Sequence, residues 1–154
     1  MSVPVGTVLP PLCVEVSPTF VISTAIASRD FQDVHHDRDR AVRRGSKDIF
    51  VNILTTNGLV QRFVTDWAGP DAVVLGIAIR LGVPCYAYET LTFTGTVGSS
   101  CDGVCVVEVV GRNGLGDHVT GSVRVRLPGG AALPDGVSLP VGASLPKGVT
   151  DGVS

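Results

Sequence analysis

The sequence lacks the features of several protein classes. Its 154 residues include 12 Lys or Arg against 14 Asp or Glu, a formal net charge of -2, so it has no basic surplus of the kind that nucleic-acid-binding proteins carry. No run approaches the roughly 18 consecutive apolar residues that a membrane helix needs. The N-terminus has no basic region followed by an apolar one, as a signal peptide has. We therefore expect a cytoplasmic protein that binds neither nucleic acid nor a membrane.

Cysteine is also sparse, and only one pair of cysteines is close in the sequence. Cys101 and Cys105 stand in the segment SCDGVC, where they could clip a metal ion or simply flank a turn. No His or second Cys pair accompanies them at the spacing of a zinc site. Asp102 and Gly103 between them are typical of a hairpin turn. We therefore expect small residues beside a turn and no metal site.

Apolar residues are abundant, since 44% of the chain is hydrophobic and only 17% is charged. The length fits one domain. A domain this small with so much aliphatic content would leave apolar surface exposed unless it associates with another chain. We expect an oligomer.

Two segments of the first half have the pattern of regular structure. Residues 19–28, TFVISTAIAS, form an apolar run rich in β-branched side chains and predict a strand. Residues 46–67 are the only long helical candidate, with Ser46 or Asp48 at the start and Gly69 followed by proline at the end. The apolar residues of this candidate cover a broad face, so we expect a largely buried helix.

The chain beyond Pro70 has the pattern of β-structure. Four segments of strand length, separated by turns that contain glycine, span residues 72–82, 88–100, 103–113 and 118–127. The last of them alternates apolar and polar side chains, as a strand with one buried face does. One long helix and a meander of strands predict an α+β fold.

The last 27 residues differ in composition from the rest. Residues 128–154 repeat a six-residue pattern, as in LPDGVS and LPVGAS. A hexapeptide period can indicate a left-handed β-helix, but four repeats could bury almost nothing. We therefore predict a folded domain over residues 1–127 and a largely disordered Pro/Gly-rich tail.

Charge is concentrated in one segment, SRDFQDVHHDRDRA, at residues 28–41. It contains four Asp, three Arg and two His, and Asp30 precedes His35 by five positions. An acid and an imidazole at this spacing could share a site. A solvated loop with a helix cap at Asp37 or Asp39 would explain the same residues, and DRDRAVRR by itself predicts a short helix.

Three segments, in this order, resemble segments of the MaoC-like enoyl-CoA hydratases. RDFQDVHHDRDRA resembles the hydratase-2 motif, in which an Asp precedes a His by five positions and a small residue, here Ala41, follows six later. Residues 81–97 are similar to a later strand pair of the family, and residues 109–127 to its closing hairpin. The resemblance covers about residues 5–127. The segments GSKDIFVNIL and QRFVTDWAGP more specifically resemble the small subunits of bacterial hydratases of steroid side-chain CoA thioesters.

The resemblance implies a single hotdog domain, an antiparallel sheet wrapped around one long central helix. It also implies an enzyme that adds water across the α,β double bond of an enoyl-CoA and needs no cofactor, because CoA is part of the substrate. Asp30 and His35 would hold the water and return its proton. The backbone N–H of Asn52 would donate to the thioester oxygen as it becomes enolate-like.

Two places depart from the family's pattern. Val51 and Asn52 stand where most members have His and Gly early in the central helix. Gln32 and Asp33 stand where most members have Asn and, further on, Pro. The Asn52 N–H can still serve as an oxyanion donor, but the Cβ and amide of this residue crowd the approach that Gly leaves open.

Other polar residues of the segment need separate interpretations. In an extended chain neighbouring side chains point to opposite faces, so only one of His35 and His36 can share the pocket of Asp30. Spacing and resemblance both favour His35, which leaves His36 as a structural hydrogen-bond partner or a surface residue. Five cations near the site could contact CoA phosphates or form a solvated helix face: Arg29, Arg40, Arg43, Arg44 and Lys47.

The resemblance implies partners as well. The site would be shared with a second MaoC-like subunit that lacks the acid–His pair, in a heterodimer or heterotetramer, and a thiolase-like aldolase would act on the hydrated product. The implied substrate is a steroid CoA thioester from the breakdown of cholesterol or a related sterol. Three alternatives stay open: a homodimeric (R)-specific hydratase of straight-chain enoyl-CoA, a hotdog acyl-CoA thioesterase, and a non-catalytic structural subunit.

Overall fold

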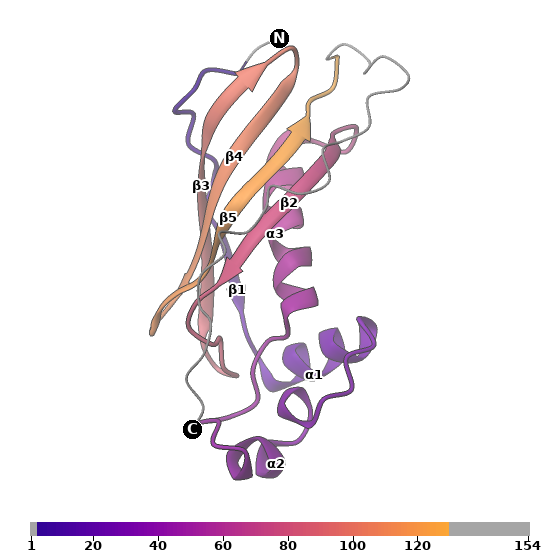
Figure 1. The fold of residues 1–154 in the computed structure, drawn as a ribbon, viewed down its shortest axis with the longest axis vertical. Helices are drawn as coiled ribbons and strands as arrows, with labels where there is room; N and C mark the ends of the chain where they lie inside the picture. Colours follow the sequence, from indigo (N-terminus) through magenta and orange to yellow (C-terminus); the bar gives the residue numbers. More distant parts are fainter. Residues whose placement is uncertain (1–2, 130–154) are drawn as a thin grey trace, which may run out of the picture.

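Five antiparallel strands form one sheet in the order β1-β3-β4-β5-β2, and one long helix, α3, lies along it (Figure 1). The computed structural model describes residues 3–129. The elements are β1 (Leu12–Glu15), α1 (Pro18–Ala27), the single 3-10 turn η1 (Asp33–His35), α2 (Arg38–Arg43), α3 (Ile53–Ala68), β2 (Val73–Leu81), β3 (Thr90–Cys101), β4 (Val104–Asn113) and β5 (Gly116–Arg126). The short helices α1 and α2 lie near one end of the sheet (Figure 1). This is the hotdog arrangement expected of the α+β chain.

The strand predicted over residues 19–28 is wrong, because this segment forms the helix α1. Ser17 caps the helix by accepting a hydrogen bond from the Phe20 N–H at 3.0 Å, and Pro18 occupies the first turn, where its missing N–H is not needed. Val21 and Ala25, four residues apart, are fully buried on one face. The capping residues outweigh the β-branched composition that favours a strand.

The long helix begins later than its sequence pattern predicts. It starts at Ile53 behind the cap residue Asn52, not near Ser46, and it ends at Gly69 as expected. The preceding segment is extended because it pairs with the chain before β3: the Val51 N–H donates to the Cys85 carbonyl, and Phe50 forms a bridge with Tyr86. This tertiary pairing overrides the local helical pattern.

One close contact of helix α3 with the sheet is aromatic. The rings of Phe63 on α3 and Phe93 on β3 are both buried and their centroids lie 6.1 Å apart. A Cβ at Gly95 would lie 2.8 Å from the Phe63 ring, so only glycine permits this approach of helix and strand. The helix is buried on one face only, since Ile53 and Leu54 in its first turn are each 52% exposed.

The predicted β-segments agree with the observed strands to within a few residues. On β5, Val119 and Val123 are buried and Arg124 is exposed, which confirms the alternation. Asp102 and Gly103 form the tight turn between β3 and β4 with φ of 48° and 76°, as a two-residue hairpin loop requires.

The sequence also predicts a short helix at the end of the polar segment and a disordered tail. Helix α2 confirms the short helix predicted from DRDRAVRR, and Asp37 caps it by accepting from the Arg40 N–H. The tail predicted over residues 128–154 lies outside the described residues, apart from Pro128 and Gly129, so its boundary stays a prediction. Within residues 3–129, no helix is both long and apolar enough to cross a bilayer.

Candidate active site

The end of helix α1 places Asp30. Ser28 closes the helix, and Arg29 follows with a left-handed φ of 56°. The Arg29 N–H donates to the Ile26 carbonyl and the Asp30 N–H to the Ala25 carbonyl, at 3.0 and 2.9 Å. These two bonds are those of a Schellman motif, whose left-handed position is usually glycine. The motif turns the chain sharply and directs Asp30 to the region where α3 begins.

The 3-10 turn η1 brings His35 to Asp30. The His35 Nε2 atom lies 3.4 Å from Asp30 Oδ2, and the two side chains are 7% and 19% exposed. On the other side of the ring, Nδ1 lies 2.7 Å from the Phe50 carbonyl oxygen. A carbonyl can only accept, so Nδ1 carries a hydrogen. In the neutral form of the ring, the lone pair of Nε2 then faces the carboxylate.

In this neutral form two acceptors face each other across a gap of 3.4 Å. A carboxylate oxygen and an unprotonated Nε2 cannot bond directly, but a water molecule can donate one hydrogen to each of them. The lone pairs of such a water would then point away from the pair. The arrangement can hold a water as a nucleophile and accept the proton that it loses.

The side chain of Asn52 also contacts this pair. Its Nδ2 atom donates to Asp30 Oδ2 at 3.0 Å and to Ser28 Oγ at 2.9 Å, while its Oδ1 accepts from the Thr55 N–H at 3.0 Å. Asn52 is only 2% exposed. No hydrogen bond within residues 3–129 uses its backbone N–H, so this donor at the start of α3 has no partner among the described residues.

The surroundings of Asp30 affect its pKa in opposite directions. Burial by itself raises the pKa. The hydrogen bonds from Asn52 and from the Gln32 N–H oppose this effect, and a positive charge on His35 or His36 opposes it further, so that the pKa of Asp30 is held below its usual value. The carboxylate is thus kept ionised, and both of its oxygens accept hydrogen bonds.

Individual proteins are similar to this chain, although no protein-family model matches it. The chain is 64% identical over 123 residues to the 3-oxo-4,17-pregnadiene-20-carboxyl-CoA hydratase beta subunit of Mycobacterium tuberculosis, covering 80% of this chain and 95% of that protein. It belongs to the MaoC-like enoyl-CoA hydratases.

Solved structures of MaoC-like proteins have the same fold. A chain of the ChsH1-ChsH2 complex from Mycobacterium tuberculosis, also 64% identical, superposes with a TM-score of 0.79 over 80% of this chain and 98% of that one. The (R)-hydratase of A. caviae involved in PHA biosynthesis is 20% identical and superposes with a TM-score of 0.75, covering 82% of this chain and 98% of that one. The hotdog fold expected from the MaoC-like motifs is confirmed.

The structure brings together the three residues that the MaoC-like resemblance singles out, Asp30, His35 and Asn52. The premise used for His36 is wrong, because the chain is a 3-10 turn there and not extended. The expected structural role is nevertheless confirmed: His36 Nε2 lies 2.6 Å from the backbone carbonyl oxygen of Asp30. His36 thereby supports the backbone of Asp30 and leaves the carboxylate to His35.

Sequence reasoning missed the residues that surround this group. Ser28 was treated only as the last residue of the predicted strand and the first of the polar segment, although it accepts a hydrogen bond from Asn52. His118 lies far away in sequence, yet its Nε2 atom is 2.9 Å from Thr56 Oγ1 in the first turns of α3. An Asn directly before a helical run signals an N-cap and would have placed the helix start at Asn52. No signal in the sequence pairs His118 with Thr56.

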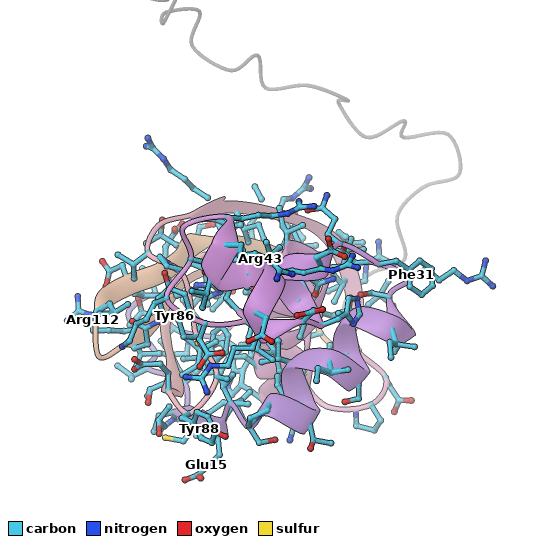
Figure 2. The ribbon with its side chains drawn as sticks, turned by 90° about the horizontal axis from the view of Figure 1, so that it is seen from below. Glu15, Phe31, Arg43, Tyr86, Tyr88 and Arg112 are labelled. Carbon is cyan, nitrogen blue, oxygen red and sulfur yellow. The ribbon has the colours of Figure 1, made fainter. Side chains whose placement is uncertain are left out.

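The cations near the site differ in their contacts. Arg40 and Arg44 form ion pairs with Asp33 at 3.2 and 3.0 Å, and Lys47 Nζ lies 5.7 Å from the centre of the Tyr86 ring. Figure 2 shows the labelled Arg43 near the middle of the end view. Contact of any of these cations with CoA stays a prediction.

A partly apolar cavity of about 330 Å³ opens between α1 and α3 next to the site. Phe20 and Ser28 line it from α1, and Leu54 and Leu59 line it from α3. Ser28 is shared between this cavity and the hydrogen bonds of Asn52. Apolar space therefore adjoins the polar group of Asp30, His35 and Asn52.

Proposed function

We propose that this chain is the catalytic subunit of a heteromeric hydratase that adds water across the α,β double bond of a steroid side-chain CoA thioester. The observation that carries the proposal is the contact of Asp30 Oδ2 with His35 Nε2 at 3.4 Å, in a chain 64% identical to a hydratase beta subunit of that specificity. The second subunit would be another MaoC-like chain, as the solved ChsH1-ChsH2 complex suggests.

Apolar side chains around the pair support a covering partner and an apolar substrate. Ile26, Phe31, Ile53 and Leu54 stand close in sequence to the site residues and are each more than half exposed. Phe31 points outward at the edge of the end view, on the side away from Tyr86 and Arg112 (Figure 2). Large apolar side chains gathered in this way are typical of surfaces that another chain or a ligand covers.

The edge of the sheet gives a second reason to expect a partner. Among residues 3–129, strand β2 pairs only with β5, so its other edge is unpaired. Val73 and Leu81 on this strand are 49% and 42% exposed. An unpaired edge with apolar side chains is a template for association with another sheet.

In the proposed reaction the pair activates the water. Water held by Asp30 and His35 attacks Cβ of the enoyl group, forming a C–O bond while an O–H bond of the water breaks. The released proton is held by the pair and is then delivered to Cα, forming the C–H bond. One water is added in total, with hydroxyl at Cβ and hydrogen at Cα, and no cofactor takes part.

The start of helix α3 would stabilise the charge that develops. When water attacks Cβ, negative charge moves to the thioester oxygen. The Asn52 N–H, which donates to no other group within residues 3–129, is the donor that we assign to this oxygen. It lies at the N-terminal end of a 16-residue helix, where the helix dipole also favours negative charge.

The chemistry of the product implies the next step. Hydration yields a β-hydroxy thioester, which is the substrate of carbon–carbon cleavage by a thiolase-like aldolase. Because CoA thioesters are intracellular metabolites, the proposed function includes a cytoplasmic location.

The proposal is tested by hydration of 3-oxo-4,17-pregnadiene-20-carboxyl-CoA, followed by the mass gain of one water. The chain is assayed alone and co-expressed with a MaoC-like partner, each time beside Asp30→Asn and His35→Ala. We expect turnover that requires the partner and falls by about 100-fold or more in both variants, since positioned acid–base groups contribute about this much. Asp39→Ala, in the same polar segment but exposed, is the control and should retain activity.

Other outcomes would assign a different function. Turnover of a short straight-chain enoyl-CoA by the chain alone, with none of the steroid, would indicate a homodimeric hydratase. Release of free CoA without hydration would indicate a thioesterase. Unchanged turnover in Asp30→Asn and His35→Ala, with a weakened complex, would indicate a structural subunit.

A further inference from the structure

Asn52 differs from the glycine that MaoC-like hydratases most often have at this position, and its amide forms three hydrogen bonds. Both Nδ2 hydrogens are used, one on Asp30 Oδ2 at 3.0 Å and one on Ser28 Oγ at 2.9 Å. Oδ1 accepts from the Thr55 N–H at 3.0 Å. A polar side chain that is 2% exposed and fully hydrogen-bonded is held in one orientation.

The orientation of the amide follows from its partners. A carboxylate can only accept, and a backbone N–H can only donate. Exchanging Oδ1 and Nδ2 would place two acceptors against each other at Asp30 and two donors against each other at Thr55, so the observed orientation of Asn52 is the one that satisfies all three contacts. Nδ2 therefore always presents a hydrogen to Asp30.

We infer that the Asn52 side chain is a positioning residue for hydration: it fixes the catalytic carboxylate of Asp30 by tying it to the start of α3 and the end of α1. This inference rests on the proposed function. It gives Asn52 a second role beside that of its backbone N–H. The same side chain that crowds this N–H would also orient the carboxylate of Asp30.

The contacts of Ser28 explain how the amide joins two helices. The Ser28 hydroxyl donates its hydrogen to the Thr24 carbonyl at 2.8 Å, which leaves its oxygen free to accept from Asn52. Ser28 closes α1 and Asn52 caps α3. Asp30, two residues beyond Ser28, is thus held between two helix ends that the same amide connects.

Other residues at this position would not provide the same contacts. Ser and Asp also cap helices well, but a serine hydroxyl has one hydrogen, and an aspartate has none to donate. Asp would also place a second carboxylate against Asp30. Gly would keep the backbone N–H and cost little as a cap, but it would leave Oδ2 of Asp30 without the donor at 3.0 Å.

These differences make two substitutions informative. Asn52→Gly removes the amide and the crowding Cβ together and keeps the backbone donor. Asn52→Asp keeps the helix cap and replaces the donor by an acceptor. Both are measured in the complex with the MaoC-like partner, using 3-oxo-4,17-pregnadiene-20-carboxyl-CoA, and the dependence of kcat on pH is recorded.

We expect kcat to fall about tenfold or more in Asn52→Gly and further in Asn52→Asp, with KM changed much less, because hydrogen bonds to charged groups are strong enough for such a loss. In the unchanged protein the hydrogen bond from Asn52 lowers the pKa of Asp30. Both variants lose this bond, so the pKa rises and the acidic limb of the kcat profile should move to higher pH. A residue that only supported the fold would not move this limb.

The matched control is Asn57→Asp, which makes the same change five residues further along α3. It should leave kcat and the acidic limb unchanged. Thermal unfolding of each complex reports whether the variants fold.

The result that overturns the inference is an Asn52→Gly complex with unchanged or raised kcat and an unmoved acidic limb, while Asp30→Asn is inactive. The amide would then only obstruct the oxyanion donor. If Asp30→Asn itself keeps full activity, the proposed function fails, and that outcome is distinct from the first.

Discussion

Thr56 on helix α3 and His118 on strand β5 are hydrogen-bonded inside the protein, with Thr56 Oγ1 2.9 Å from His118 Nε2. On the other side of the ring, Nδ1 lies 2.8 Å from the Val83 carbonyl oxygen and must donate to it. The neutral ring therefore accepts from the Thr56 hydroxyl. This contact joins the first turns of α3, and with them the cap Asn52, to the sheet.

We predict that Thr56→Val destabilises the protein by about 1–3 kcal/mol, because it leaves the buried His118 Nε2 without a donor. Valine has nearly the shape of threonine, so little packing is lost. Thr56→Ser retains the hydroxyl and should cost less. Chemical denaturation of both variants measures the difference, and equal stability of the two would show that the hydrogen bond contributes nothing.

His118 should make stability depend on pH. Burial lowers its pKa below the usual 6.5, and the hydrogen bond to Val83 opposes only part of this effect. The unfolded chain therefore takes up a proton at His118 at a higher pH than the native chain does. Stability contributed by the neutral ring is complete above pH 6.5 and is lost as pH falls from 6.5 toward the lowered native pKa.

The measurement is the free energy of unfolding at a series of pH values between 7 and 5. In His118→Asn the decline below pH 6.5 should be shallower than in the unchanged protein. Asp30 does not interfere in this range, because its pKa lies below 3.8 in the folded state and its contribution is lost only at more acidic pH. Parallel curves for the two proteins would contradict the prediction.

The left-handed residue before the site gives a further prediction. Arg29 has φ of 56° in the turn that places Asp30, and a left-handed conformation costs a residue with a side chain about 1–2 kcal/mol. Arg29→Gly should therefore raise the unfolding free energy by up to about 1 kcal/mol, part of the gain being offset by the entropy of glycine. Arg29→Val should lower it, because β-branched residues fit this conformation worst. A higher unfolding free energy for Arg29→Val than for Arg29→Gly would contradict the left-handed conformation of this turn.

How far the sequence predicts the fold depends on whether its signals are local. The strands after Pro70 and the turn at Asp102 were predictable because alternation and turn residues act within a few positions. The strand predicted for residues 19–28 failed because an apolar β-branched run fits either structure, and the decisive residues, Ser17 and Pro18, lie just before it.

The contacts of the site were likewise predictable only where the residues lie close together in the sequence. Asp30 and His35 were predictable from their spacing and from the resemblance, since both lie in one short segment. The side-chain contact of Asn52 with Asp30 was not, because it depends on where α3 begins, and that is set by the pairing of the preceding segment with residues 85–87. A contact between side chains 22 residues apart needs the fold to be known.

The apolar rim beside the site gives the last prediction, which concerns the partner. Leu54 in the first turn of α3 is 52% exposed and lies two residues from Asn52. If the second subunit covers this surface, Leu54→Glu buries an unpaired charge in the interface, which costs several kcal/mol, while the free chain tolerates it. We expect the variant to fold normally but to separate from the partner in gel filtration at micromolar concentration, and to lose turnover.

Val5→Glu, at a residue 66% exposed in the N-terminal segment, is the matched control and should leave the complex intact. An intact, fully active complex of Leu54→Glu would show that the partner leaves this surface uncovered, so that the contact must be sought instead along the unpaired edge of β2.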